Sequence, residues 1–243
     1  MNEQLRLENV RNVLARLEET IIFGLIERAQ YCSNSIVYEA EKLDAGQERL
    51  SIVRYLLKAT EKIHAHVRRY TSPDEHPFFS DLPPPILPAL RYDENPLRPT
   101  AVNINDRLLA AYEREIVPYI CREGDDGQYG SSAVCDVNCL QALSKRVHYG
   151  KFVAESKYRA DPARFQPLID ARDTNALRVC ITDTSMEKQV LSRVRRKARM
   201  YAADLNSTEG VHSLDPECVV AIYERWVIPL NKDVQVSYLQ ERT

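Results

Sequence analysis

The segment LSKRVHYGKFVAESKY, residues 143–158, decides how this chain is read. Apolar residues recur in it at helical spacing and predict a helix with one buried face: Leu143, Val147, Ala154 and Tyr158. At about 100° per residue, Arg146 and Lys157 point within about 20° of each other and lie about 16 Å apart along the axis. Both fall on the shoulder of the buried face, where a cation needs a partner. We expect the other basic residues of the segment, Lys145, His148 and Lys151, to face solvent.

The composition is that of an ordinary soluble globular protein. Of 243 residues, 44% are hydrophobic and 28% are charged, so a disordered chain is excluded. The net charge of −2 provides no strongly basic field, and we therefore expect neither nucleic acid nor membrane as a partner. Only seven glycines are present, which favours helices over glycine-rich all-β and Rossmann folds.

The six cysteines form no CxxC pair and no zinc-type spacing with histidine, so we expect reduced thiols and no metal. The opening residues MNEQLRLENVRNVL follow an amphipathic, acid-containing pattern unlike a signal or transit peptide. No apolar run approaches the ~18 residues of a membrane span. We expect a cytoplasmic protein, with a plastid protein in its mature form, without its transit peptide, as the alternative.

Apolar spacing predicts helices along almost the whole chain. The first contains residues 10–31, and the second runs from about 50 to 70. Proline density excludes helix from about 71 to 103, which is predicted to be a long ordered crossing loop. Because neither an internal repeat nor a domain linker is evident, we predict one all-α domain over residues 1–243, a single-domain helical bundle.

The second half of the chain is also predicted to be helical, beginning near Asn105 and pausing before GDDGQYG. Ser131 or Ser132 is expected to cap the helix that carries 143–158. Further helices are expected at about 162–171, 174–182, 184–204 with Asp183 or Thr184 at its start, and from Pro216 nearly to Thr243 with a kink at Pro229.

Polar residues occupy core-facing positions on three further helices. Arg11 lies between Leu7 and Leu14, Glu187 follows Asp183 by one turn, and Asn231 and Gln235 are one turn apart. A single such residue usually snorkels to solvent or pairs with an opposite charge. Three buried cations against two acids would leave charge uncompensated unless a ligand supplied the missing anion. The joint pattern predicts a pocket for a small, largely apolar dianion.

Other chemistries lack the residues that would carry them. The chain has no G-x-S-x-G, no phosphate-binding glycine loop and no His–carboxylate motif. The two histidines of HAH, 64–66, fall on different helix faces, and RVRRKAR, 193–199, is typical of a solvated helix face. The alternative to a pocket is a purely structural bundle in which Arg11, Arg146 and Lys157 are each paired internally.

Several stretches resemble the all-helical chorismate mutases of plants and fungi, and the plant form most of all. They are IIFGLIERAQY (21–31), SPDEHPFF (72–79), GDDGQYGSSAVCD (124–136), CLQALSKRVHYGKFVAESKY (139–158) and IPLNKDVQVSYL (228–239). The resemblance implies an isomerase of the shikimate pathway that converts chorismate to prephenate by a Claisen rearrangement, in phenylalanine and tyrosine biosynthesis. It implies no cofactor. A catalytically silent regulatory homologue that binds aromatic amino acids or a partner enzyme is the alternative.

The resemblance also implies roles for the residues on the core faces. Arg11 and Arg146 would bind the two carboxylates of chorismate, Lys157 and Gln235 the ether oxygen, and Glu187 the ring hydroxyl. Asp183, Asn231 and Val153 would contact the substrate. Three positions depart from the usual pattern of fungal or other eukaryotic members: Asp183 in place of Asn, Asn231 in place of Thr, and Gln235 in place of Glu.

Regulation and assembly are implied in the same way. In regulated relatives an aromatic amino acid binds near the start of the helix that carries 143–158. The matching residues here are Arg68, Arg69, Gly130 and Ser131, with tyrosine and tryptophan as the expected effectors. An ordinary helix start beside surface arginines is the alternative. The family is typically homodimeric, and a homodimer is expected here.

Overall fold

The computed structural model describes residues 5–40, 49–89, 95–205 and 214–242. The helices are α1 (Leu7–Arg28), α2 (Ile52–His66), α3 (Asn105–Ala111), α4 (Val117–Ile120), α5 (Tyr129–His148), α6 (Gly150–Ala160), α7 (Pro162–Asp170), α8 (Thr174–Ile181), α9 (Thr184–Leu205), α10 (Pro216–Ile222) and α11 (Ile228–Glu241). Short 3-10 helices cover Ser35–Tyr38 and Arg69–Thr71. No strand occurs in these ranges, so the predicted all-α fold is confirmed. None of the helices described is long and apolar enough to cross a membrane.

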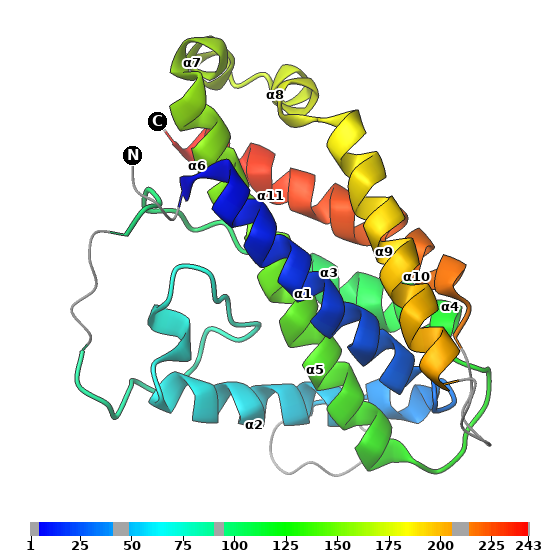
Figure 1. Ribbon diagram of the computed structural model, residues 1–243. Helices are drawn as coiled ribbons and strands as arrows, with labels where there is room; N and C mark the ends of the chain where they lie inside the picture. Colours follow the sequence, from blue (N-terminus) through cyan, green and yellow to red (C-terminus); the bar gives the residue numbers. More distant parts are fainter. Residues whose placement is uncertain (1–4, 41–48, 90–94, 206–213, 243) are drawn as a thin grey trace.

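The helix carrying 143–158 is the centre of the bundle (Figure 1). α5 and α6 follow one another as one column, because Tyr149 between them keeps right-handed helical backbone angles. α1 packs along α5, α11 packs along α6, and α9 packs on α1 and α10. The column thus brings Arg146 on α5 and Lys157 on α6 to the same side of the molecule, as the spacing predicted.

Local sequence explains several of the helix starts. A serine or aspartate side chain accepts a backbone N–H at the start of five helices, which satisfies a group with no partner inside the helix. These residues are Ser51, Asp161, Asp173, Asp183 and Asp215. The predicted caps of α5 were wrong, because that helix already begins at Tyr129 and Ser132 is buried in its first turn.

The second predicted helix ends earlier than its apolar pattern suggested. α2 stops at His66, and Arg68 takes left-handed backbone angles with φ 68°. From Ser72 to Ile104, the described residues contain no helix, as the prolines predicted. Glu61 anchors this crossing loop to α2, because its carboxylate accepts the backbone N–H groups of Phe78 and Phe79.

Two prolines lie inside helical runs and share one local solution. YEREIVP (112–118) and YERWVIP (223–229) each form a π-helical turn, at Tyr112–Ile116 and Tyr223–Val227, with proline two residues after it. Proline has no N–H to donate and its ring crowds the carbonyl four residues earlier, and a wider turn relieves both problems. The predicted run from Pro216 therefore continues through Pro229 by way of a π turn and reaches Glu241.

Candidate active site

One pocket collects every residue that the core-face pattern singled out. Its walls come from α1, α5, α6, α8, α9 and α11, and its cavity volume is about 100 Å³. Its polar lining residues are Arg11, Arg146, Lys157, Asp183, Glu187, Asn231, Lys232 and Gln235, and its apolar ones are Leu7, Leu14, Val153, Ile181, Met186, Val190 and Ile228.

Arg146 is buried in this pocket without a counter-charge. Its Nε and Nη1 atoms have no hydrogen-bond partner, and burial lowers the pKa of the guanidinium. The buried acid Glu18 acts on Arg146 through its charge, but both its oxygens accept hydrogen bonds from Arg193, at 2.6 and 2.7 Å. A buried guanidinium left unpaired is costly, and an anion bound in the pocket would remove that cost. The purely structural bundle, in which this arginine is paired internally, is therefore wrong.

Lys157 and Gln235 contact each other in the lining of the pocket. Lys157 Nζ donates to the carbonyl oxygen of Ile181 and lies 3.5 Å from Oε1 of Gln235. Burial lowers the pKa of Lys157 to about 8. Gln235 Nε2 donates to Asn231 Oδ1 at 2.9 Å, which uses one of its two hydrogens and leaves the other for a ligand.

Two ion pairs stand among the charged lining residues. Arg11 Nη2 is 4.0 Å from Asp183 Oδ2, with both side chains nearly half exposed. Lys232 Nζ is 2.6 Å from Glu187 Oε1. Sequence reasoning missed Lys232, because it follows Asn231 and so points about 100° away from the Asn231–Gln235 line. With Lys232 included, four cations face two acids, an excess of two positive charges.

Gly150, the first residue of α6, is a point of close contact between two helices. In the structure it faces α11, where an added Cβ would be 2.7 Å from the backbone oxygen of Asn231 and 2.9 Å from its Nδ2. Asn231 Nδ2 also donates to the carbonyl oxygen of Val147 at 2.9 Å. The glycine therefore lets α11 approach closely enough to hold Asn231 and Gln235 in the pocket.

The expectation that Lys145, His148 and Lys151 face solvent was wrong. His148 is fully buried, with Nε2 accepting from the backbone N–H of Ile104 at 3.0 Å. Lys151 is 2% exposed, its Nζ lies 2.7 Å from Nε2 of His76, and burial lowers its pKa to about 8. The crossing loop covers this side of the column, which a single helix's periodicity could not reveal.

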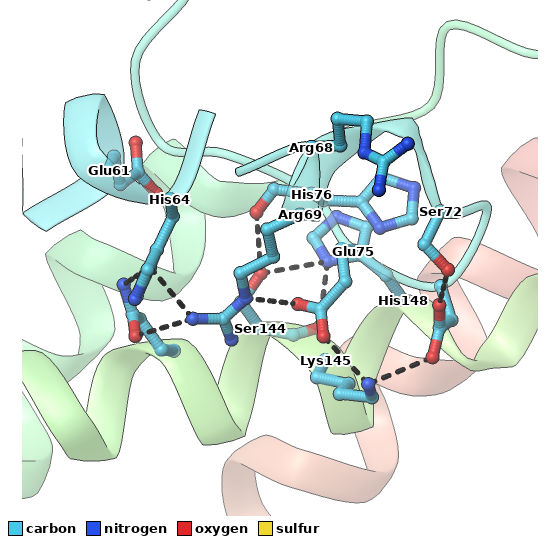
Figure 2. A network of polar contacts seen from close by, with 12 residues as sticks. Glu61, His64, Arg68, Arg69, Ser72, Glu75, His76, Ser144, Lys145 and His148 are labelled. Carbon is cyan, nitrogen blue, oxygen red and sulfur yellow. Dashed lines mark hydrogen bonds and ion pairs between the residues drawn. The ribbon is translucent and has the colours of Figure 1, made fainter. Parts of the chain in front are cut away.

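Lys145 belongs to a polar network that ties the loop to α5 (Figure 2). Its Nζ lies 2.7 Å from Glu75 and 2.9 Å from Asp74. The predicted effector residue Arg69 joins the same network through Glu75 Oε2 at 3.1 Å and Gln141 Oε1 at 2.9 Å. Arg68 turns away and donates to the carbonyl oxygen of Pro88.

The other two predicted effector residues lie elsewhere in the chain. Gly130 and Ser131 are exposed in the first turn of α5, and Gln141 is ten residues further along. Ten helical residues span about 15 Å. A single chain thus holds the four residues in two separate groups, and a joint effector site stays a prediction. Within the described ranges, no group of three or more His, Cys, Asp or Glu side chains forms a metal site.

Comparison with known proteins gives the same picture as the site. Residues 128–236 match the family model for chorismate mutase type II. The chain is 46% identical to the chorismate mutase of Schizosaccharomyces pombe, covering 100% of this chain and 98% of the relative. It is 44% identical to the chloroplastic chorismate mutase 1 of Arabidopsis thaliana, covering 99% of this chain and 75% of the relative. Plant and fungal relatives therefore match at similar identity.

Solved structures of relatives have the same fold. AtCM1 with phenylalanine bound in its allosteric site superposes with a TM-score of 0.91 at 46% identity, covering 100% of this chain and 98% of that one. Aro7p chorismate mutase from Candida albicans, in complex with L-Trp, gives 0.92 at 38% identity, covering 98% and 92%. These matches support the enzyme and not the silent regulatory alternative. The chain belongs to the type II chorismate mutases, isomerases that convert chorismate to prephenate.

Proposed function

We propose that the pocket between α1, α5, α6, α8, α9 and α11 is where this chain rearranges chorismate. The observation that carries the proposal is Arg146, which lines a pocket with two excess positive charges and whose buried guanidinium has two nitrogens without a hydrogen-bond partner. Chorismate has two carboxylates on a small, mostly apolar body. Bidentate contacts from Arg146 and Arg11 would hold one carboxylate each, and Val153 and the other apolar lining residues would pack against the ring.

The reaction explains why the pocket has no nucleophile. In a Claisen rearrangement the ether C–O bond breaks as a new C–C bond forms, so the enzyme's main task is to hold the enolpyruvyl side chain over the ring. The ether oxygen gains negative charge in the transition state. Lys157 and the free N–H of Gln235 lie next to each other and would both donate to it. Glu187 would accept from the ring hydroxyl, with Asp183 and Asn231 completing the substrate contacts.

The loss of chorismate absorbance tests these roles. Arg146→Ala and Lys157→Ala should each lower kcat/KM by at least about 100-fold while the helical CD spectrum is unchanged. Lys188→Ala is the matched control, because Lys188 is an exposed residue of α9 that is not among the residues lining the pocket. Near wild-type activity in either pocket variant would mean that the residue is structural.

We further propose that aromatic amino acids regulate the enzyme, with tyrosine inhibiting and tryptophan activating. Solved relatives hold phenylalanine or tyrosine in an allosteric site, and another is a complex with L-Trp. Arg68, Arg69, Gly130 and Ser131 are the residues proposed here. Arginines and a helix start both suit an amino acid's carboxylate. Arg69→Ala or Ser131→Ala should weaken both effects. Activity that is indifferent to millimolar effector would contradict the proposal.

A homodimer is the assembly we propose. Tyr55, Ile63 and Val67 repeat at multiples of four residues along α2 and its end, and each has about half or more of its surface exposed. Such an apolar stripe is unusual on a monomer and typical of an interface. Sedimentation should give a dimer at micromolar concentration, and Ile63→Glu should shift it to monomer. A wild-type monomer would contradict the proposal.

For the compartment, we propose the cytoplasm. The plant relatives are named as chloroplastic, whereas the fungal relative from Schizosaccharomyces pombe, matched over 98% of its own length at 46% identity, is not named for a plastid. Fractionation of the source cells with an antibody against the chain tests this directly. Recovery with plastids would favour the mature plastid form.

A further inference from the structure

Lys232 lines the pocket, but none of the substrate contacts proposed above involves it. It comes from α11, its side chain is 19% exposed, and its Nζ lies 2.6 Å from Oε1 of Glu187 on α9. Its neighbour Asp233 forms ion pairs with Arg107 and Arg178. The pair Lys232–Glu187 therefore links the α11 wall of the pocket to the α9 wall.

Glu187 needs such a partner for a physical reason. It stands one turn after Asp183, so two acids line a pocket that receives a dianion. Without a neighbouring cation, the Glu187 carboxylate would repel the dianionic substrate. Lys232 contacts Oε1, which leaves Oε2 free to accept from the ring hydroxyl.

The charge balance of the pocket points the same way. Without Lys232, the three cations Arg11, Arg146 and Lys157 would exceed the two acids by one positive charge. A substrate with two carboxylates is neutralised by an excess of two positive charges, and Lys232 supplies the second of these. The ion pair also restrains the rotamer of Glu187, and an acceptor must be held in place before it can orient a ligand.

We propose that Lys232 is a positioning residue for the rearrangement: it holds Glu187 aimed into the pocket and cancels the repulsion between Glu187 and the dianion. The proposal rests on the role proposed above for Glu187. It makes Lys232 act on substrate binding more than on the chemical step, which is the task of Lys157 and Gln235.

The experiment measures KM and kcat for chorismate in five variants: Lys232→Met, Lys232→Arg, Glu187→Gln, the double variant, and Lys188→Met. Lys232→Met should raise KM by about tenfold or more and lower kcat less. Lys232→Arg keeps the charge and should stay near wild type. Lys188→Met removes a charge from the residue next to Glu187, but on the exposed face of α9, and should change nothing.

Two readouts separate this role from simple loss of packing. Adding Glu187→Gln to Lys232→Met should lower KM again, because the uncompensated charge is gone. The second readout is Lys232→Arg, which keeps the positive charge beside Glu187 and should keep KM near the wild-type value.

The outcomes are distinct from those that test the site itself. A wild-type KM in Lys232→Met would overturn the proposal, as would a raised KM that Glu187→Gln does not relieve. If Lys232→Met lowers the melting temperature, its raised KM could reflect poor folding, and Lys232→Arg separates the two effects. The proposal fails if the arginine variant has a normal melting temperature but a raised KM. Failure of the pocket as a whole would show instead as full activity in Arg146→Ala and Lys157→Ala.

Discussion

Lys157 Nζ lies 3.5 Å from Oε1 of Gln235, and each residue has a hydrogen-bond donor near the same part of the pocket. The two differ in how they respond to pH. Lys157 is a cation that burial makes easier to deprotonate, whereas the Gln235 amide does not titrate. Pairing them gives the enzyme one charged and one neutral donor for an oxygen that becomes negative.

We predict different pH profiles for kcat/KM and kcat. The pKa of Lys157 is about 8 in the free protein, so kcat/KM should fall as pH rises through about 8 and the ammonium is lost. Bound dianion favours the protonated lysine, so kcat at saturating chorismate should stay nearly flat over mildly acidic to mildly alkaline pH. Stopped-time assays from about pH 6 to about pH 9.5 measure both. A flat kcat/KM through that range would remove Lys157 from the chemistry.

Gln235→Glu should introduce a requirement for acid. A carboxylate at 235 can donate to the ether oxygen only when it is protonated, and when ionised it repels the growing charge. Turnover of the variant should therefore decline as pH rises through the new group's pKa, while the wild type changes little. The measurement is a pair of kcat–pH profiles at saturating chorismate. Superimposable profiles would mean that Gln235 does not reach the reacting oxygen.

Lys157 should also reduce the stability of the protein. The pKa of Lys157 is about 8 in the folded protein and 10.5 ordinarily. Between these two pH values the unfolded chain therefore binds a proton at Lys157 that the folded chain does not. Stability should consequently rise with pH between those two values, and Lys157→Met should be more stable than wild type at pH 7 by about 1–3 kcal/mol. Urea unfolding at pH 7 tests the claim. A variant less stable than wild type would contradict it.

Gly150→Ala should damage both stability and catalysis. A Cβ at 150 would lie 2.7 Å from the backbone oxygen of Asn231, so α11 would have to move and carry Gln235 with it. We expect a loss of about 1–3 kcal/mol and a lower kcat. Gly130→Ala is the control, because nothing lies within 4 Å of its added Cβ, and a helical alanine there should stabilise slightly. Equal effects of the two substitutions would argue against close packing at Gly150.

The spacing of apolar residues predicted the helices and the residues that line the pocket. Both can be recognised from the buried face of each helix, which is visible in that helix's own sequence. The polar residues at 11, 146, 157, 183, 187, 231 and 235 broke apolar stripes, and each proved to line the pocket. What periodicity could not supply was the far side of the α5–α6 column. His148 and Lys151 are buried by a loop that has no periodic pattern.

Lys232 and Gly150 show a second limit of the sequence. The partner of Lys232 is Glu187, 45 positions away on another helix, and the neighbour that Gly150 accommodates is Asn231. Neither relation leaves a local signal, because both arise only when α11 docks. The π turns before Pro118 and Pro229 were not predicted, because a proline inside a helix does not by itself specify a widened turn before it.

Arg28 is also a buried arginine, and its surroundings differ from those of Arg146. Arg28 is fully buried and saturated, with Asp136 Oδ1 at 2.7 Å from its Nε and further bonds to Cys32 and Ser33. Removing it would leave the buried Asp136 carboxylate without its counter-charge, with only the hydroxyl groups of Tyr38 and Tyr112 donating to it, a loss of about 3–5 kcal/mol. Arg146 leaves no acid behind, because Glu18 is held by Arg193.

The decisive measurement is therefore chorismate turnover together with the free energy of unfolding for Arg146→Met and Arg28→Met. If the charge of Arg146 serves to bind the substrate, Arg146→Met will lower kcat/KM by at least about 100-fold. The same variant will be at least as stable as the wild type, whereas Arg28→Met will be strongly destabilised. An Arg146→Met protein that turns over chorismate normally, or that is destabilised as much as Arg28→Met, would contradict the account.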